Sequence, residues 1–224
     1  MKKKPNIVLA LDVDSFQRAK YFIDKLYPTV KIFKVGAQLF TACGPKVVEL
    51  IRKKGAQAFL DLKYFDIPNT VAHAVRQAVR MKVKMLTLHI LGDEEMLKAA
   101  RAAAIDEARR LKVSRPLLIG VTVLTSKEAN FSDVLTLARI GLECGLDGVV
   151  CSVREASLLR KKFKKRFVII TPGIRSTGAL HNDQKRTATV EEAKAAGSNF
   201  LVIGRPILEA KDALQAAKAI ARSL

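Results

Sequence analysis

Short apolar segments alternate along this chain with longer segments in which apolar side chains return every three or four positions. The short segments are rich in β-branched and aliphatic residues, which is typical of strands that are buried on both faces. Between them, residues 45–54 and 94–111 have helical character, and Thr189 with Glu192 forms a capping-box signature. The pattern predicts eight strands, at residues 7–13, 32–35, 58–62, 85–90, 117–124, 148–151, 168–171 and 200–203.

The regular alternation of strand and helix predicts a parallel sheet with helical crossovers. Eight such units within 224 residues favour a closed (β/α)₈ barrel, or TIM barrel, as a single domain over residues 1–224. An open, doubly wound sheet is the alternative. Such a sheet usually carries a glycine-rich dinucleotide loop after its first strand, whereas residues 12–15 contain no glycine. We therefore expect the barrel and no dinucleotide site.

The hydropathy of the chain and its N-terminal residues indicate the cellular location of the protein. Hydrophobic residues make up 49% of the chain, which is enough for a large core, and no apolar run approaches the length of a membrane span. Residues 1–11 imitate the start of a signal peptide, but Asp12 and Asp14 interrupt the apolar run and no small-residue cleavage site follows. We expect a cytoplasmic protein with no membrane partner.

The three cysteines and three histidines are dispersed along the chain. The cysteines form no CxxC pair, so neither a disulfide framework nor a zinc site is expected. We expect no metal site and assign no histidine to catalysis. These residues are Cys43, Cys144, Cys151, His73, His89 and His181.

The charge balance is strongly basic, with 40 Lys and Arg against 21 Asp and Glu and a formal net charge of +19. This balance fits an anionic substrate that is drawn in by long-range attraction, and it also fits loose binding to nucleic acid. The densest basic run, residues 160–166, has no nucleic-acid-binding motif around it. We interpret this run as a solvated helix end and expect no specific nucleic-acid partner.

Two acids and a lysine lie within six residues directly after the third apolar run. Side chains alternate along a strand, so Asp61 and Lys63 share one face at the strand's end. Asp66 follows in a loop that Pro68 stiffens. Barrel enzymes keep their reactive groups at the carboxyl ends of strands, so this acid, base, acid array predicts proton chemistry there.

The seventh and eighth strands are followed by loops that suit a phosphate group. Gly173 and Gly204 allow backbone N–H groups to approach an anion closely, and Arg175 and Arg205 can pair with its oxygens. This pair of loops commonly holds phosphate in barrel enzymes. Residues 183–186 add an amide donor and more positive charge. The alternative is that both arginines form surface ion pairs.

These motifs together resemble the orotidine 5′-phosphate decarboxylase family, over nearly the whole chain. The most specific one is the ten-residue stretch that begins at Asp61 and ends at Thr70. The others are Leu11-Asp12-Val13-Asp14, Lys34-Val35-Gly36, Val121-Thr122-Val123-Leu124-Thr125-Ser126, Thr171-Pro172-Gly173-Ile174-Arg175, Asp183-Gln184 and Ile203-Gly204-Arg205-Pro206.

The resemblance implies removal of CO₂ from orotidine 5′-phosphate to give UMP, with no metal and no organic cofactor. It implies a charged array of Lys34, Asp61, Lys63 and Asp66, in a homodimer in which Asp66 and Thr70 reach the neighbouring subunit's site. It also implies a set of substrate contacts. They are Asp12 and Lys34 at the ribose, Ser126 at the pyrimidine, and Gln184, Gly204 and Arg205 at the phosphate with Arg175 nearby.

The chain departs from the family pattern in two places, one of which is Tyr64-Phe65, where the family often has Phe followed by His. After His89 the family usually has small residues and glycines, whereas this chain has Ile90-Leu91-Gly92-Asp93. We therefore expect a differently shaped loop after the fourth strand.

The chemistry of Lys63 has alternatives. As an ammonium group it would stabilise a carbanion and donate a proton, and as a neutral amine it would form a Schiff base. Neighbouring carboxylates favour the charged form, so the proton donor is preferred. A purely structural ion-pair network at the barrel end is a third interpretation.

Two other functions compete with the decarboxylase. Magnesium-dependent sugar-phosphate lyases of the same superfamily, such as hexulose-phosphate synthase or keto-gulonate-phosphate decarboxylase, share the Asp-x-Lys-x-x-Asp motif but typically follow it with Ala-Gly. Here residues 67–70 follow instead, which argues against them. A basic nucleic-acid-binding protein on a barrel scaffold is the more distant alternative.

Overall fold

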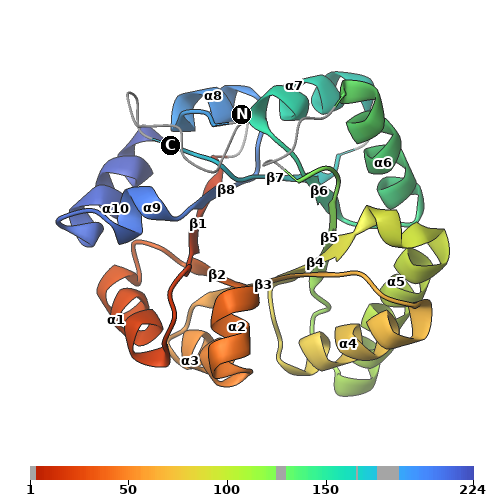
Figure 1. The fold of residues 1–224 in the computed structure, drawn as a ribbon, viewed down its shortest axis with the longest axis horizontal. Helices are drawn as coiled ribbons and strands as arrows, with labels where there is room; N and C mark the ends of the chain where they lie inside the picture. Colours follow the sequence, from red (N-terminus) through yellow and green to blue (C-terminus); the bar gives the residue numbers. More distant parts are fainter. Residues whose placement is uncertain (1–3, 125–129, 165, 176–186) are drawn as a thin grey trace.

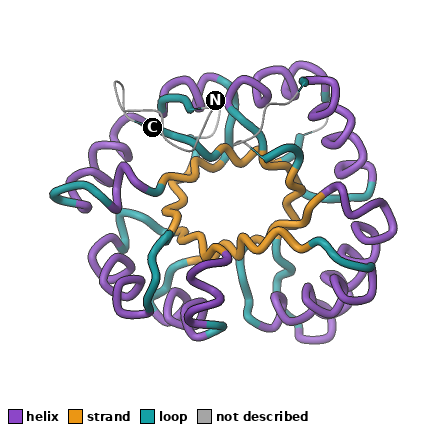
Figure 2. The backbone as a smooth tube through the Cα atoms, in the orientation of Figure 1, coloured by secondary structure: helices purple, strands orange, loops and turns teal. Residues whose placement is uncertain are grey.

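The computed structural model describes residues 4–124, 130–164, 166–175 and 187–224. Eight parallel strands close into a barrel in which each strand pairs with its neighbour in the sequence and β8 pairs with β1. Helices surround the strands as an outer ring (Figures 1 and 2). The predicted (β/α)₈ barrel is therefore confirmed.

The strands match the predicted apolar runs, although several bounds differ. The first and fifth strands end earlier than predicted, because the chain leaves the barrel wall before its polar loop residues. The third strand runs on to Tyr64 and so includes Asp61 and Lys63. The strands are β1 Asn6–Ala10, β2 Ile32–Gly36, β3 Gln57–Tyr64, β4 Met85–His89, β5 Leu117–Val121, β6 Gly148–Val150, β7 Val168–Thr171 and β8 Phe200–Ile203.

The helices fill the crossovers, and the described crossover between β2 and β3 contains two α-helices. Two further helices follow β8, where the side chain of Asp212 caps the second one by accepting from two backbone N–H groups. The helices are α1 Phe16–Leu26, α2 Ala37–Cys43, α3 Lys46–Lys53, α4 Pro68–Arg80, the 3₁₀ turn η1 Ile90–Gly92, α5 Asp93–Leu111, α6 Phe131–Glu143, α7 Val153–Lys162, α8 Val190–Ala195, α9 Arg205–Leu208 and α10 Ala213–Ser223.

Two apolar cores hold the barrel together. The larger one lies between the outer faces of the strands and the helices. The smaller one is made of strand residues alone, so it fills the barrel interior. Its buried members are Val8, Ile32, Phe59, Met85, Ile119 and Ile170.

The interior core also sets where the polar side chains lie. Residues two positions further along a strand point to the same face. Lys34 therefore follows Ile32 inward, Asp61 follows Phe59, and a polar layer covers the apolar one at the carboxyl ends of the strands. Within the described part of the chain, no helix is long and apolar enough to cross a membrane.

Candidate active site

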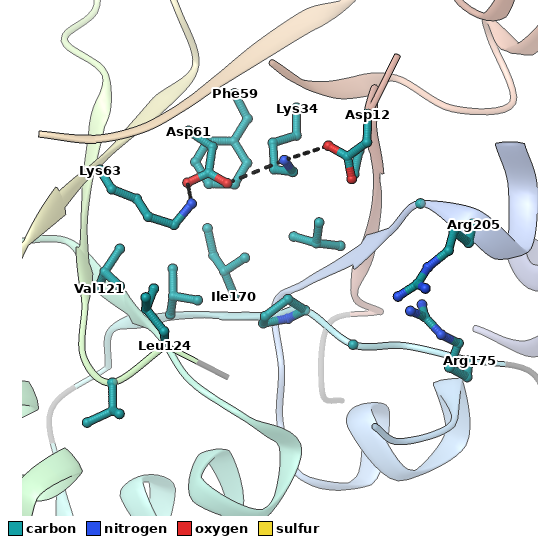
Figure 3. Close-up of a pocket in the computed structure, with 17 residues that line it drawn as sticks. Asp12, Lys34, Phe59, Asp61, Lys63, Val121, Leu124, Ile170, Arg175 and Arg205 are labelled. Atoms are coloured by element: carbon teal, nitrogen blue, oxygen red, sulfur yellow. Dashed lines mark hydrogen bonds and ion pairs between the residues drawn. The ribbon is translucent and has the colours of Figure 1, made fainter. Parts of the chain in front are cut away.

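A cavity of about 300 Å³ opens at the carboxyl ends of the strands (Figure 3). Phe59 and Ile170 of the interior core form part of its wall. Charged side chains line two opposite sides, with a lysine and aspartate array on one and two arginines on the other (Figure 3). The cavity therefore combines an apolar wall with two separate charged regions.

The lysine and aspartate array is a chain of ion pairs. Lys34 Nζ lies 3.3 Å from Asp12 Oδ1 and 3.4 Å from Asp61 Oδ2. Lys63 Nζ lies 3.0 Å from the other oxygen, Asp61 Oδ1. The side chains of Lys34 and Asp61 are each 12% exposed, whereas Lys63 is 39% exposed. Asp61 thus bridges two ammonium groups, and Lys63 is the more accessible of them.

Burial and charge act in opposite directions on this array. Burial alone would raise the pKa of Asp61, but the charges of Lys34 and Lys63 and the hydrogen bonds to the carboxylate hold that pKa below its ordinary value. Burial alone would lower the pKa of Lys34, but the carboxylates of Asp61 and Asp12 hold it above its ordinary value. Both groups are therefore charged at neutral pH.

Thr87 on β4 completes the array, and sequence analysis did not identify it. Its hydroxyl accepts from the backbone N–H of Lys63 at 2.8 Å and donates to Asp61 Oδ1 at 3.0 Å. The residue is fully buried. A polar residue two positions after Met85 in an otherwise apolar strand is the signal that would have indicated it.

An irregularity in β3 places these groups together. Leu60 pairs with Leu86 and Tyr64 with Leu88, so three residues of β3 lie opposite the single residue Thr87. Lys63 has a φ of 50°, a backbone conformation that side chains other than glycine rarely adopt. Bulges of this kind redirect side chains and are frequent beside active sites. Here the bulge brings Lys63 back toward Asp61.

The opposite side of the cavity carries Arg175 and Arg205. Their guanidinium groups point toward one another in Figure 3, across from the array. Gly173 and Gly204 also line the cavity, and Gly173 has a φ of 78° that favours glycine. An anion between the two guanidinium groups could pair with both of them.

Two of the remaining predicted residues, Asp66 and Thr70, do not line this cavity. Asp66 and Thr70 are exposed outside it, and Asp66 Oδ1 accepts from the backbone N–H of Ile67 at 2.7 Å. Ser126 and Gln184 lie outside the described residues. Among the described residues, no group of three or more His, Cys, Asp or Glu side chains is placed to hold a metal ion.

The segment after His89 forms a short 3₁₀ turn. Ile90–Gly92 forms the turn η1, in which Ile90 is buried and Leu91 is 61% exposed. The ring of His89 packs 5.5 Å from that of Phe65, centroid to centroid. The end of β4 therefore packs against Phe65, which lies two residues after Lys63 in the chain.

Fold and site together define a (β/α)₈ barrel protein with a lysine and aspartate array that faces two arginines across a cavity. The sequence profile of the Orotidine 5′-phosphate decarboxylase / HUMPS family matches residues 5–220. The chain belongs to this family.

Individual relatives agree with that assignment. The orotidine 5′-phosphate decarboxylase of Hydrogenovibrio crunogenus is 46% identical over 219 residues, covering 93% of this chain and 91% of the relative. That of Moorella thermoacetica is 42% identical over 236 residues, covering 100% and 94%. Among solved structures, orotidine 5′-phosphate decarboxylase from Lactobacillus acidophilus matches with a TM-score of 0.86 at 34% identity, over 99% of both chains.

Proposed function

We propose that this protein decarboxylates orotidine 5′-phosphate to UMP and CO₂, the last step of UMP synthesis. Membership of the family and the names of its full-length relatives support this activity. The single observation that carries it is the Lys63 to Asp61 ion pair, which faces a cavity whose other side holds two arginines. The side with Lys63 and Asp61 thus suits the reacting pyrimidine ring, and the side with the two arginines suits the phosphate.

Lys63 is the proposed proton donor. When the bond between C6 and the carboxylate breaks, CO₂ leaves and the electron pair stays on C6, in an orbital that the ring does not delocalise. A fixed ammonium group stabilises this developing charge. It then transfers a proton to C6, and the resulting amine regains a proton from solvent.

Asp61 and Lys34 are proposed to keep Lys63 in place. Asp61 accepts from Lys63 at 3.0 Å, which holds the side chain toward the cavity. A Schiff base needs the neutral amine, which would give up this ion pair, so the contact argues against it. Lys34 pairs with the second oxygen of Asp61 at 3.4 Å. By the family resemblance, Lys34 and Asp12 contact the ribose.

The phosphate is proposed to bind between Arg175 and Arg205, beside Gly204. Two planar guanidinium groups match the oxygens of a phosphate dianion. By the family resemblance, Gln184 contributes at the phosphate and Ser126 at the pyrimidine. Binding energy from this non-reacting group serves to position the ring against Lys63.

We further propose a homodimer in which Asp66 and Thr70 complete the partner's site. Both residues are exposed in one chain and lie outside its own cavity. Three large apolar side chains are exposed in the same region, Phe65 at 61%, Ile67 at 66% and Leu91 at 61%. Exposed apolar side chains that lie together are typical of an interface.

The test is to mix purified protein with orotidine 5′-phosphate and EDTA and to follow the loss of pyrimidine absorbance. Decarboxylation that survives EDTA is expected. Activity that disappears with EDTA and returns with magnesium would instead favour a magnesium-dependent sugar-phosphate lyase of the superfamily. Because the substrate is a charged nucleotide, we place the reaction in the cytoplasm as part of this proposal.

A further inference from the structure

A second cavity, of about 900 Å³, lies at the opposite end of the barrel from the candidate active site. It is formed where α7 and α8 end and where β7 and β8 begin, and these two helices are neighbours in the ring (Figure 1). Among the described residues, five basic side chains and no acidic one line it. They are Lys4, Arg160, Lys161, Arg166 and Lys194.

The positive charge of this cavity is not neutralised within the described part of the chain. None of the ion pairs there involves any of the five basic residues. Lys161, Arg166 and Lys194 are exposed and come from separate segments. Their mutual repulsion destabilises the empty cavity, and a bound anion would relieve it.

Arg160 is held in place by neutral oxygens. Its guanidinium donates to the carbonyl oxygens of Gly197 and Phe167 and to Asn199 Oδ1, at distances of 2.7 to 3.1 Å. It also lies over the ring of Phe167, 4.6 Å from the centroid. These contacts fix the side chain and leave its positive charge uncompensated by a carboxylate.

Ser198 packs behind the basic side chains of this cavity. The residue lines the same cavity but is only 4% exposed, so it belongs to the inner wall. Its hydroxyl oxygen is buried and has no hydrogen-bond partner among the described residues. An unpaired buried hydroxyl costs free energy, and native proteins usually pair such a group with protein, water or a ligand.

We propose that this cavity binds a small anion with a chain of phosphates. Several cations without a carboxylate partner suit a multiply charged phosphate chain. The concave shape favours a small molecule over a polynucleotide, which binds along an open basic surface. The site is separate from the proposed phosphate site at Arg175 and Arg205.

The test is calorimetric titration of the purified protein with inorganic triphosphate. The triple variant Lys161→Ala/Arg166→Ala/Lys194→Ala should bind at least about tenfold more weakly. The double variant Arg175→Ala/Arg205→Ala should keep this binding, since it alters only the candidate active-site cavity. Binding that survives the triple variant, or that is lost only in the double variant, overturns the proposal.

A charge-matched variant separates local contacts from the general field of the protein. Lys31→Ala/Lys46→Ala/Lys84→Ala removes the same number of positive charges from exposed positions that form no ion pair among the described residues. It should bind triphosphate within about twofold of the wild type. An equal loss in both triple variants would show a net-charge effect and overturn the site.

A separate measurement tests the class of ligand. An oligonucleotide of single-stranded RNA should bind more weakly than triphosphate. Tight, steeply salt-dependent RNA binding without triphosphate binding would identify a nucleic-acid surface and overturn the small-anion proposal.

Discussion

Thr87 and Asp61 are joined by a 3.0 Å hydrogen bond from the threonine hydroxyl to the carboxylate oxygen that also accepts from Lys63. The same hydroxyl accepts from the backbone N–H of Lys63. One buried group on β4 therefore contacts both members of the pair that we propose to carry the chemistry. A side chain that never reaches the substrate can in this way set the geometry of the proton donor.

Thr87 is accordingly expected to act as a positioning residue. Thr87→Val keeps the shape but removes the hydroxyl, and kcat should fall about ten- to a hundredfold, since a hydrogen bond to a charged group is lost. KM should change little, because the phosphate rim is untouched. Thr87→Ser restores the hydroxyl and should recover most of the activity. Equal losses in both variants would indicate a packing role instead.

The proton-donor role of Lys63 predicts a loss of turnover without a loss of fold. Lys63→Ala should reduce kcat by roughly 10²–10⁴-fold or more, as measured by loss of pyrimidine absorbance. The control is Lys98→Ala, which removes an exposed lysine paired with Glu94 on α5 and should leave kcat unchanged. Near-normal turnover by a folded Lys63→Ala protein rules out this role.

The phosphate assignment predicts an effect that depends on the substrate. Arg205→Ala should lower kcat/KM for orotidine 5′-phosphate on the order of a hundredfold, because a charge-assisted contact is removed. The same variant should lose far less on the nucleoside that lacks the phosphate. Equal losses on the two substrates would contradict a phosphate role for Arg205.

The proposed shared site predicts complementation between two inactive variants. Lys63→Ala and Asp66→Ala would damage opposite halves of the proposed two-chain site, so a mixed dimer would contain one intact site. Unfolding and refolding the two proteins together in equal amounts should restore about a quarter of wild-type activity, the fraction expected for random pairing. A mixture as inactive as its components would show that Asp66 does not act across subunits.

An acid between two arginines predicts how stability depends on pH. Arg110 and Arg80 hydrogen-bond to Glu107, which links α4 to α5, and lower the pKa of its carboxyl from 4.5 to about 2. Because the folded pKa is the lower one, this stabilisation is complete above pH 4.5 and is lost as the pH falls toward 2.

Glu107→Gln should therefore lower Tm by several degrees at pH 7, because two guanidinium groups lose their partner. The difference in Tm between variant and wild type should become smaller below pH 4.5, the ordinary pKa of this carboxyl. The control Glu94→Gln alters an exposed pair and should shift Tm little. A difference in Tm that stays constant as the pH falls to the point of acid unfolding would contradict a stabilising role for the Glu107 carboxylate.

The alternation of apolar runs and helical segments was sufficient to predict the barrel. Strands that alternate with helices form a parallel sheet with helical crossovers, and eight such units favour a closed barrel. The alternation of side chains likewise predicted that Asp61 and Lys63 lie at the end of the third strand, where both belong to the charged array. These features depend on residues that are close together in the chain. They could therefore be inferred from local periodicity.

Other features arise only when the barrel closes. The pairing register of β3 with β4 decides that three residues lie opposite Thr87, and no local pattern signals that bulge. Closure also brings Lys34 between Asp12 and Asp61. It likewise gathers basic residues from distant segments around Ser198 at the other end of the barrel. The sequence by itself determined which elements form and which faces they bury, whereas contacts between distant strands depend on register and closure, which only the tertiary structure decided.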